Sequence, residues 1–108
     1  MKKIALITGA AGGLGQAFAV RLARDGADIV LVDIKSCEET AKLVQAAGCK
    51  AMQNVCDVTS EEAISRLAAD VGREFGQCDI LINNAGIYPI QSFDTLTFAD
   101  WRRVMALN

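Results

Sequence analysis

A cluster of glycines near the amino terminus is the first feature of this 108-residue sequence whose residue types and spacing suggest chemistry. The stretch TGAAGGLG covers residues 8–15, between an apolar run and a segment with helical periodicity. Glycine permits a sharp turn, a close approach of the backbone to a ligand and tight packing of the next helix. Free N–H groups at the start of that helix favour an anion such as pyrophosphate. The pattern predicts a phosphate-binding turn, and a purely structural tight turn is the alternative.

A carboxylate at the end of the next apolar run supports the same chemistry. Asp33 lies 18 residues after Gly15, close to the spacing expected of an acid that holds a ribose diol. A 2′-phosphate would be repelled by Asp33 and would need a nearby arginine, whereas only Lys35 offers a positive charge there. These features predict NAD in preference to NADP. A solvated strand end and a site for S-adenosylmethionine, which also needs a ribose grip, are alternatives.

Alternating strand and helix patterns explain how these residues are brought together. Near-continuous apolar runs predict strands buried on both faces, and periodic apolar positions predict helices between them. The expected strands span 3–8, 28–33, 51–57 and 79–83, residues 84–96 are expected to form a loop, and a helix follows it. This order predicts an α/β fold, a Rossmann-type three-layer sandwich whose parallel sheet has the strand order 3-2-1-4.

Start signals and apolar stripes define the expected helices. The first carries an apolar stripe at i, i+4 and i+8, and the others begin at capping-box patterns. The stripe consists of Leu14, Phe18 and Leu22, and the boxes are Ser36 with Glu39, Thr59 with Glu62, and Thr97 with Asp100. The third helix carries the apolar stripe Ile64, Leu67, Val71 and Phe75, and the fourth carries Phe98, Trp101 and Met105. Because no stop signal follows Asn108, the last helix is expected to continue.

Composition excludes several classes of function. A formal net charge of −2 without a basic run argues against nucleic acid as a partner. No apolar stretch reaches the ~18 residues of a membrane span, and the start does not resemble a signal peptide. The absence of histidine excludes a Ser-His-Asp triad and a His-ligated metal. The four cysteines form no C-x-x-C, so reduced thiols in a cytoplasmic protein are expected rather than a zinc site.

Together, these motifs resemble the short-chain dehydrogenase/reductase family. The glycine turn fits T-G-x-x-x-G-x-G, the pattern of the compact single-domain branch, through Gly13. It equally fits T-G-x-x-G-x-x-G, the pattern of the extended epimerase-like branch, through Gly12. The NNAG at 83–86 is the compact branch's motif at the end of the fourth strand, and the CDV at 56–58 also fits. The resemblance covers the whole chain and favours the compact branch.

The resemblance implies a role for each matching residue. The cofactor-binding residues that it implies are Gly9, Gly13, Leu14 and Gly15 at the phosphates, Asp33 at the adenosine ribose, Asp57 and Val58 beside adenine, and Asn84, Ala85 and Gly86 on the adenosine side. Asn83 is expected to steady the strand. Asn108 lies where the family keeps a helical asparagine whose backbone helps to hold a water of the proton relay. A surface asparagine is the alternative reading of Asn108.

The family's catalytic pair is missing from these residues. Its tyrosine transfers the alcohol proton, and a lysine four residues later lowers that tyrosine's pKa. The only tyrosine is Tyr88, with Ser92 four positions later, so Tyr88 is not the catalytic tyrosine. Residues 1–108 are therefore expected to be the N-terminal, cofactor-binding part of one Rossmann domain, in a chain of roughly 250 residues. Alone, they are expected to be inactive and prone to aggregation.

The predicted function is NAD-dependent hydride transfer between nicotinamide and a secondary alcohol or ketone, in a protein that is a homodimer or homotetramer when intact. The segment 87–101 begins where the family's substrate pocket begins, with Tyr88 and Ile90 as possible lining residues or as loop packing. The sequence of this segment after NNAG is similar to that of 1-phenylethanol dehydrogenases. A non-catalytic nucleotide-binding or interaction module is the alternative from another class, and a methyltransferase half is a third.

Overall fold

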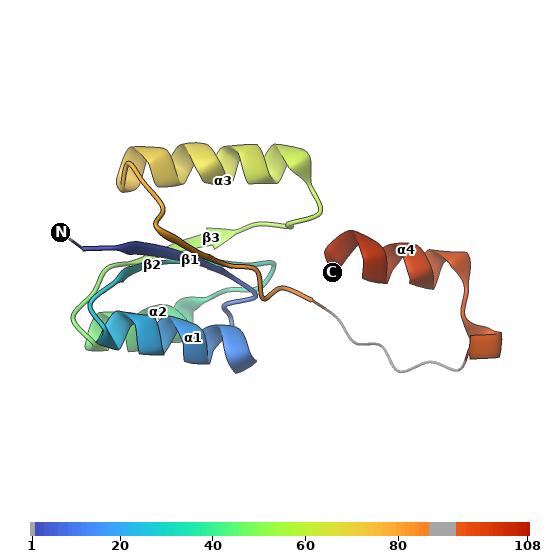
Figure 1. The fold of residues 1–108 in the computed structure, drawn as a ribbon, viewed down its shortest axis with the longest axis horizontal. Coiled ribbons are helices and arrows are strands. Elements are labelled where there is room, and N and C mark those ends of the chain that lie inside the picture. Colours follow the sequence, from blue (N-terminus) through green and yellow to red (C-terminus); the bar gives the residue numbers. More distant parts are fainter. Residues whose placement is uncertain (1, 87–92) are drawn as a thin grey trace.

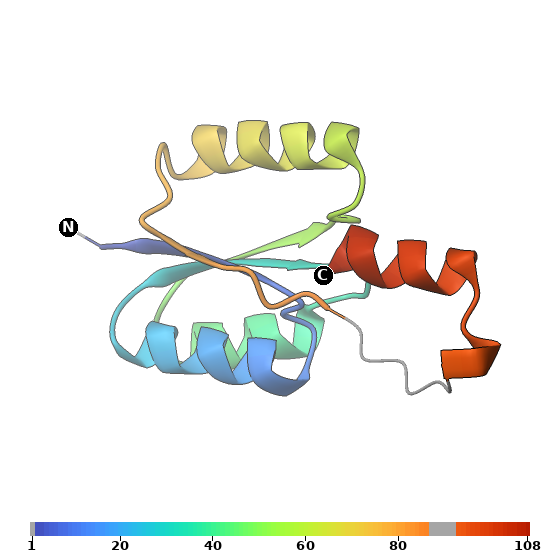
Figure 2. The ribbon, with the colours of Figure 1, turned by 45° about the vertical axis from the view of Figure 1, so that its right-hand side comes forward.

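A four-stranded parallel sheet, in the order β3-β2-β1-β4, forms the centre of the structure (Figure 1). The computed structural model describes residues 2–86 and 93–108. Its elements are β1 (Ile4–Thr8), α1 (Gly13–Arg24), β2 (Asp28–Asp33), α2 (Glu38–Ala46), β3 (Ala51–Val55), α3 (Glu61–Glu74), β4 (Ile80–Ile82), the 3₁₀ helix η1 (Phe93–Thr95) and α4 (Phe98–Leu107). Helices α1 and α2 cover one face and α3 covers the other (Figure 2). The expected α/β class, layering and strand order are confirmed.

The strand register brings the carboxyl ends of all four strands to one edge. Thr8 of β1 is paired with Val32 of β2, Asp33 with Val55 of β3, and Ile7 of β1 with Ile82 of β4. Both ribbon views place the start of α1 and the carboxyl end of α4 at this edge. Residues 56–57 and 83, which were expected to continue strands, have already left the sheet. Loops that follow the strands therefore meet in one place, where ligands bind in open α/β sheets.

Alternation along the strands divides the core into two layers. Ile7 is fully buried and packs with Ala19 of α1 and Val44 of α2 in one apolar cluster. Leu6, the residue directly before Ile7, belongs to the opposite cluster with Leu67 of α3. Successive side chains of a strand point to opposite faces, so both faces of this sheet need apolar residues. The two central strands, β1 and β2, are almost entirely buried and support the loops at the carboxyl edge of the sheet.

The face of α1 that packs on the sheet is offset by one residue from the expected stripe. Leu14 is 68% exposed and Phe18 is 37% exposed, whereas Leu22, the third member of that stripe, is partly buried and packs against the core. The buried positions are instead Gly15, Ala19 and Ala23. Their spacing is the same i, i+4, i+8, but their small side chains let the helix approach the sheet closely, whereas the larger residues would hold it away.

The predicted start of α2 is wrong in detail. The N-cap is Cys37, which makes no side-chain capping bond, so the box of Ser36 with Glu39 is not formed. The Ser36 hydroxyl accepts the N–H of Glu38 at 3.3 Å instead. The reason lies upstream, where the Asp33 carboxylate accepts the N–H of Lys35 at 3.1 Å and fixes the path of the chain into the helix.

The start of α3 is displaced by one residue for a similar reason. The expected box of Thr59 with Glu62 is absent, because Thr59 donates its N–H and its hydroxyl to Asp57, at 2.9 and 2.7 Å. Ser60 is the N-cap and accepts the N–H of Ala63 at 3.2 Å. An aspartate two residues before a turn residue captures that residue locally and competes with capping. In the expected stripe of this helix, Leu67 and Val71 are buried, Phe75 is partly buried and Ile64 is 39% exposed.

The start of α4 agrees with the prediction. Thr97 accepts the N–H of Asp100 at 3.1 Å, and the Asp100 carboxylate accepts the N–H of Thr97 at the same distance. The apolar stripe of this helix is exposed, at 68% for Phe98, 55% for Trp101 and 61% for Met105. The predicted loop before it contains η1, and its residues Tyr88 and Ile90 lie outside the described residues.

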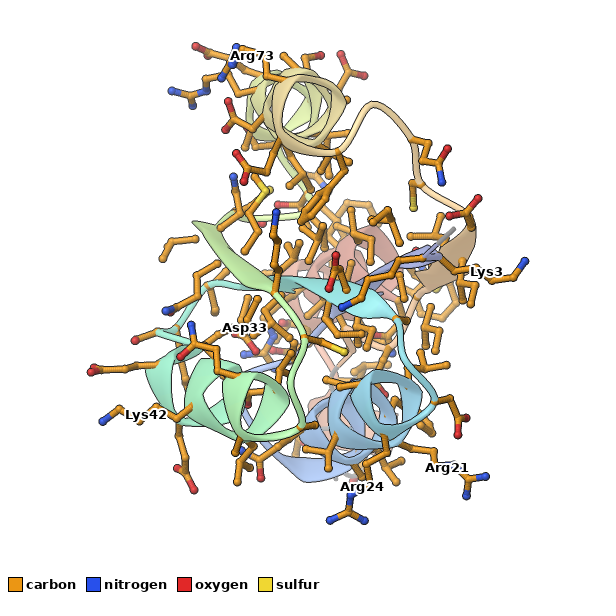
Figure 3. All side chains as sticks on the ribbon, turned by 90° about the vertical axis from the view of Figure 1, so that its left-hand side faces the viewer. Lys3, Arg21, Arg24, Asp33, Lys42 and Arg73 are labelled. Carbon is orange, nitrogen blue, oxygen red and sulfur yellow. The ribbon has the colours of Figure 1, made fainter. Side chains whose placement is uncertain are left out.

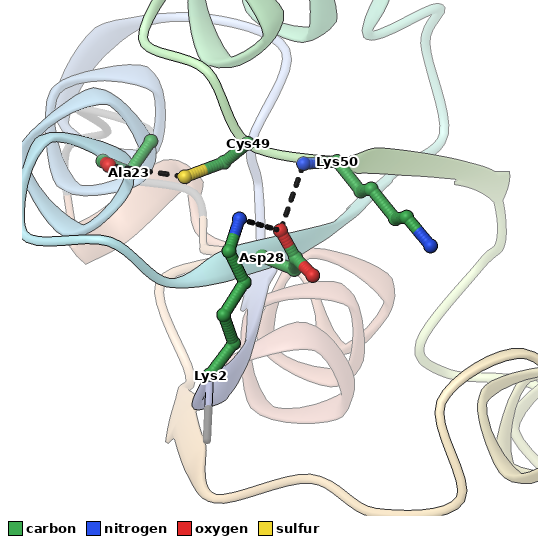
Figure 4. Close-up of polar contacts among 5 residues, drawn as sticks. All are labelled: Lys2, Ala23, Asp28, Cys49 and Lys50. Atoms are coloured by element: carbon green, nitrogen blue, oxygen red, sulfur yellow. Dashed lines mark hydrogen bonds and ion pairs between the residues drawn. The ribbon is translucent and has the colours of Figure 1, made fainter.

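A polar cluster fixes the opposite, amino edge of the sheet (Figure 4). The buried Asp28 carboxylate accepts the N–H of Lys50 at 2.8 Å and pairs with the Lys2 ammonium at 3.1 Å. Burial opposes the charged carboxylate, but the Lys50 N–H and the Lys2 ammonium outweigh it, so the pKa of Asp28 is lowered. The cluster joins the start of β1 to β2 and β3, far from the carboxyl edge.

Among the described residues, none of the helices combines the length and the apolar character that a membrane span needs. No group of three or more histidine, cysteine, aspartate and glutamate side chains in the part of the chain that the structure describes is placed to hold a metal ion.

Candidate functional site

A cavity of about 480 Å³ opens at the carboxyl edge of the sheet. Six residues with an expected cofactor role line it together: Gly9, Asp33, Val58, Asn84, Ala85 and Gly86. Its other lining residues come from the same strand ends and from α4, and they include Gly12, Ile34 and Lys35. Gly13, Leu14, Gly15, Asp57 and Asn108 do not line this cavity. The volume lies within the range of small-molecule sites, which is ~300–1,000 Å³.

The glycine turn needs glycine at three positions. Gly9 has φ +68°, and a Cβ there would lie 2.9 Å from Nδ2 of Asn84 and 3.1 Å from Cα of Ala85. A Cβ on Gly15 would lie 2.1 Å from the carbonyl oxygen of Gly9, which is far inside van der Waals contact. Gly13 has φ +56°, a left-handed conformation that side chains disfavour. Glycine at positions 9 and 15 allows close packing, and glycine at position 13 allows the turn.

Gly12 has no such requirement. Its backbone is extended, with φ −169° and ψ −172°, and a Cβ there would meet nothing within 4 Å. Of the two glycine patterns that the sequence allows, the geometry therefore requires the one with Gly9, Gly13 and Gly15. The same turn leads directly into α1, whose first N–H groups have no partner within the helix and suit an anion.

Thr8 ties the glycine turn to the segment after β4. Its hydroxyl oxygen accepts the N–H groups of Asn84 and Ala85, both at 3.0 Å. The Asn84 amide in turn donates to the carbonyl of Gly9 at 3.3 Å. Asn84 therefore braces this segment, and Asn83, which is expected to steady the strand, is exposed. Sequence reasoning missed Thr8, although a hydroxyl at the end of an apolar strand and directly before a glycine turn was a signal for it.

Asp33 is held in a fixed orientation. One carboxylate oxygen accepts the N–H of Ala11 at 3.0 Å, and the other accepts the N–H of Lys35 at 3.1 Å. In Figure 3 the labelled basic side chains on the helices point outward, whereas Asp33 lies inward, between the sheet and the layer of α1 and α2. A carboxylate oxygen has two acceptor sites, so each oxygen keeps capacity for a hydroxyl group in the cavity.

The CDV segment forms an apolar wall of the cavity. Cys56 is buried and lines the cavity together with Val58. Burial, and then the charge of Asp57, raise the pKa of the Cys56 thiol, so it is neutral near pH 7. Asp57 itself is exposed, and its carboxylate is occupied by Thr59, which lowers its pKa. In this structure Asp57 shapes the turn, and its neighbours on either side provide the wall.

Asn108 reaches the same edge from the end of α4. A Cβ on Gly86 would lie 3.2 Å from Oδ1 of Asn108. Asn108 lines a second cavity, of about 720 Å³, with Thr8, Asn83 and Ala85. This second cavity continues along α3, where its walls are apolar, with Leu67, Val71 and Leu81 among them. The two cavities adjoin each other, because Val58, Ala85 and Leu107 line both.

Known proteins match nearly the whole of this chain. The family profile described as short chain dehydrogenase matches residues 3–108. The 2-dehydro-3-deoxy-D-gluconate 5-dehydrogenase of Dickeya dadantii is 43% identical over 108 residues, which are 98% of this chain and 42% of that protein.

Solved structures agree with the sequence match. A short chain dehydrogenase from Mycobacterium paratuberculosis bound to NAD superimposes with a TM-score of 0.93 at 35% identity, over 97% of this chain and 44% of that one. An NAD⁺-bound xylitol dehydrogenase gives a TM-score of 0.92 at 39% identity, over 97% and 42%. The chain thus spans less than half the length of the relatives that it matches.

Proposed function

The chain belongs to the short-chain dehydrogenase family, and from this premise we propose that the protein is an NAD-dependent oxidoreductase acting on a secondary alcohol or ketone. The described residues would hold the adenosine and pyrophosphate part of the cofactor. The observation that carries the proposal is the cavity at the sheet's carboxyl edge, with the Asp33 carboxylate at one wall and glycine backbone at another. NAD supplies the hydride acceptor when bound, and the protein orients it.

The residues present fit such a cofactor. Gly9, Ala11 and Gly12 line the cavity, so the backbone of the turn is accessible to a phosphate there. The first N–H groups of α1 would hold that phosphate, near Gly13 and Leu14. The Asp33 carboxylate would accept hydrogen bonds from ribose hydroxyls and would repel a 2′-phosphate. Val58 and the backbone of 84–86 would enclose adenine between apolar surfaces.

Asn108 is proposed to take part in catalysis through its backbone, which would hold a water on the path of the proton. The support for this role is that Asn108 lines the second cavity and that its side chain lies against Gly86, which lines the first. The proton of the alcohol itself would be transferred by a tyrosine with a lysine four residues later, a pair that residues 1–108 do not contain. Assembly as a homodimer or homotetramer in the cytoplasm belongs to the same proposal.

Titration of the protein with NADH, NADPH and S-adenosylmethionine tests this function. Nicotinamide fluorescence or calorimetry is expected to show saturable NADH binding and at least tenfold weaker NADPH binding. Binding of S-adenosylmethionine without NADH would refute the proposal. NADH binding without oxidation of any secondary alcohol by the full protein would favour a non-catalytic nucleotide-binding module.

A further inference from the structure

Thr40 is a fully buried polar side chain on α2 that the proposed cofactor contacts do not include. Its hydroxyl donates a hydrogen bond of 2.7 Å to the carbonyl of Ala10, in the middle of the glycine turn. The same oxygen accepts the side-chain N–H of Gln16, on α1, at 3.0 Å. One hydroxyl group therefore joins the turn, α1 and α2. Because Gln16 supplies a proton to this oxygen, the hydroxyl's own proton is directed to Ala10.

The peptide groups on both sides of this contact are also fixed. The N–H of Ala10 donates to the carbonyl of Val32 at 3.1 Å, and the N–H of Ala11 donates to Asp33 at 3.0 Å. Ala10 is fully buried, whereas Ala11 and Gly12 line the cavity. The cavity wall is thus the exposed side of a short segment that β2 and α2 hold from behind. Of the three residues that hold this segment from behind, Val32, Asp33 and Thr40, only Thr40 belongs to a helix.

We propose that Thr40 is a positioning residue for the dinucleotide site, because its hydrogen bond to Ala10 fixes the orientation of the peptide groups that face the cofactor. The inference rests on the proposed function. Without the hydroxyl, the Ala10 carbonyl would be buried without this donor, which costs free energy. The turn could recover that free energy by rotating the peptide toward water, that is, toward the cavity. The cofactor would then meet a turn that it must reorder before binding, and its affinity would fall.

Thr40→Val tests this role, since valine keeps the shape of threonine and removes the hydroxyl. We expect the Kd of NADH to rise about tenfold, which corresponds to about 1.4 kcal/mol. Thr40→Ser keeps the hydroxyl and is expected to bind NADH within about twofold of wild type. Val44→Ala is the matched control, because Val44 is fully buried on the same helix, one turn later, and packs in the apolar core. It is expected to lower thermal stability without changing NADH affinity.

The outcomes separate this inference from the proposed function. A wild-type protein that does not bind NADH refutes the proposed function, and with it the inference that rests on it. If the wild type binds NADH, an unchanged Kd for Thr40→Val overturns the role of Thr40 alone. So does an equal loss of affinity in Val44→Ala, which would show a general effect of stability, or a loss in Thr40→Ser that matches the valine variant. If Thr40→Val does not fold, Thr40→Ala removes the same hydroxyl with a residue that favours helix and carries the same expectations.

Discussion

Alanine at positions 12 and 15 of the glycine turn is expected to have opposite consequences, although both residues are glycines of one motif. At Gly15 the added methyl would lie 2.1 Å from the carbonyl oxygen of Gly9 and 2.8 Å from Nδ2 of Asn84. The first neighbour is backbone and cannot move without shifting β1 or the turn. At Gly12 the methyl would meet nothing within 4 Å, and the extended backbone accepts any residue. Gly15→Ala and Gly12→Ala are therefore a matched pair.

The size of the difference follows from two opposing effects. Overpacking against a fixed neighbour costs about 1–3 kcal/mol, and a contact this short belongs at the upper end. Position 15 lies in α1, where replacing glycine by alanine recovers about 1 kcal/mol of helix propensity. The expected net loss for Gly15→Ala is about 2 kcal/mol of unfolding free energy. For Gly12→Ala the expected change is within about 0.5 kcal/mol, as for other surface substitutions.

Urea unfolding and NADH titration of the two variants measure these effects. Gly15→Ala is expected to lower both the unfolding free energy and the affinity for NADH, because the turn and the start of α1 are displaced together. Gly12→Ala should match the wild type in both measurements. If Gly12→Ala were as damaging as Gly15→Ala, the reasoning from the geometry of the turn would be refuted. The second glycine pattern, with position 12 as a required glycine, would then be correct.

Three further substitutions test the framework around the site. Asp28→Asn is expected to cost about 1–2 kcal/mol at pH 7, because it removes the ion pair with Lys2 and weakens the hydrogen bond that the backbone N–H of Lys50 donates. Since folding lowers the pKa of Asp28, its contribution is present above about pH 4 and is lost as pH falls through the folded pKa, so urea unfolding should show the two proteins converging in acid. A constant difference at all pH values would contradict this assignment. Thr8→Val leaves two backbone N–H groups after β4 without their acceptor and should cost about 2 kcal/mol in unfolding free energy; an unchanged midpoint would count against the bracing role. Thr97→Ala removes the cap of α4 and should reduce helicity by circular dichroism and stability by about 1 kcal/mol, without changing NADH affinity; weaker NADH binding in this variant would show that the position of α4 matters more than inferred.

The architecture could be predicted because the decisive signals are local and repeated. The apolar runs at 3–8 and 28–33 are long enough to specify buried strands, and strand–helix alternation leaves few topologies. Asp33 and the glycine turn were found for the same reason, since each directly follows a strand and must lie at the sheet's carboxyl edge.

Details that depend on tertiary contacts could not be predicted in this way. The capping pattern at Thr59 was wrong because Asp57 takes the hydroxyl of that threonine, a competition that spacing alone does not reveal. The sheet-facing side of α1 was misplaced because it consists of small residues such as Ala19, which a search for large apolar positions overlooks. Thr40 gave no sequence signal, since its role depends on a contact with Ala10, 30 residues earlier in the chain.

Discrimination between NADH and NADPH is the sharpest test of NAD binding beside Asp33, measured as the ratio of the Kd for NADPH to the Kd for NADH in the wild type and in Asp33→Asn. Asparagine retains the size of the side chain and removes the charge that faces the cavity. At a separation of 4 Å and an effective dielectric constant of 20, two unit charges interact by about 4 kcal/mol, and solvent screening at an open cavity reduces this value. We expect a ratio of at least about ten in the wild type, which corresponds to about 1.4 kcal/mol, and a ratio near one in Asp33→Asn. A ratio that is the same in both proteins would contradict the claim that this cavity holds the adenosine ribose beside Asp33.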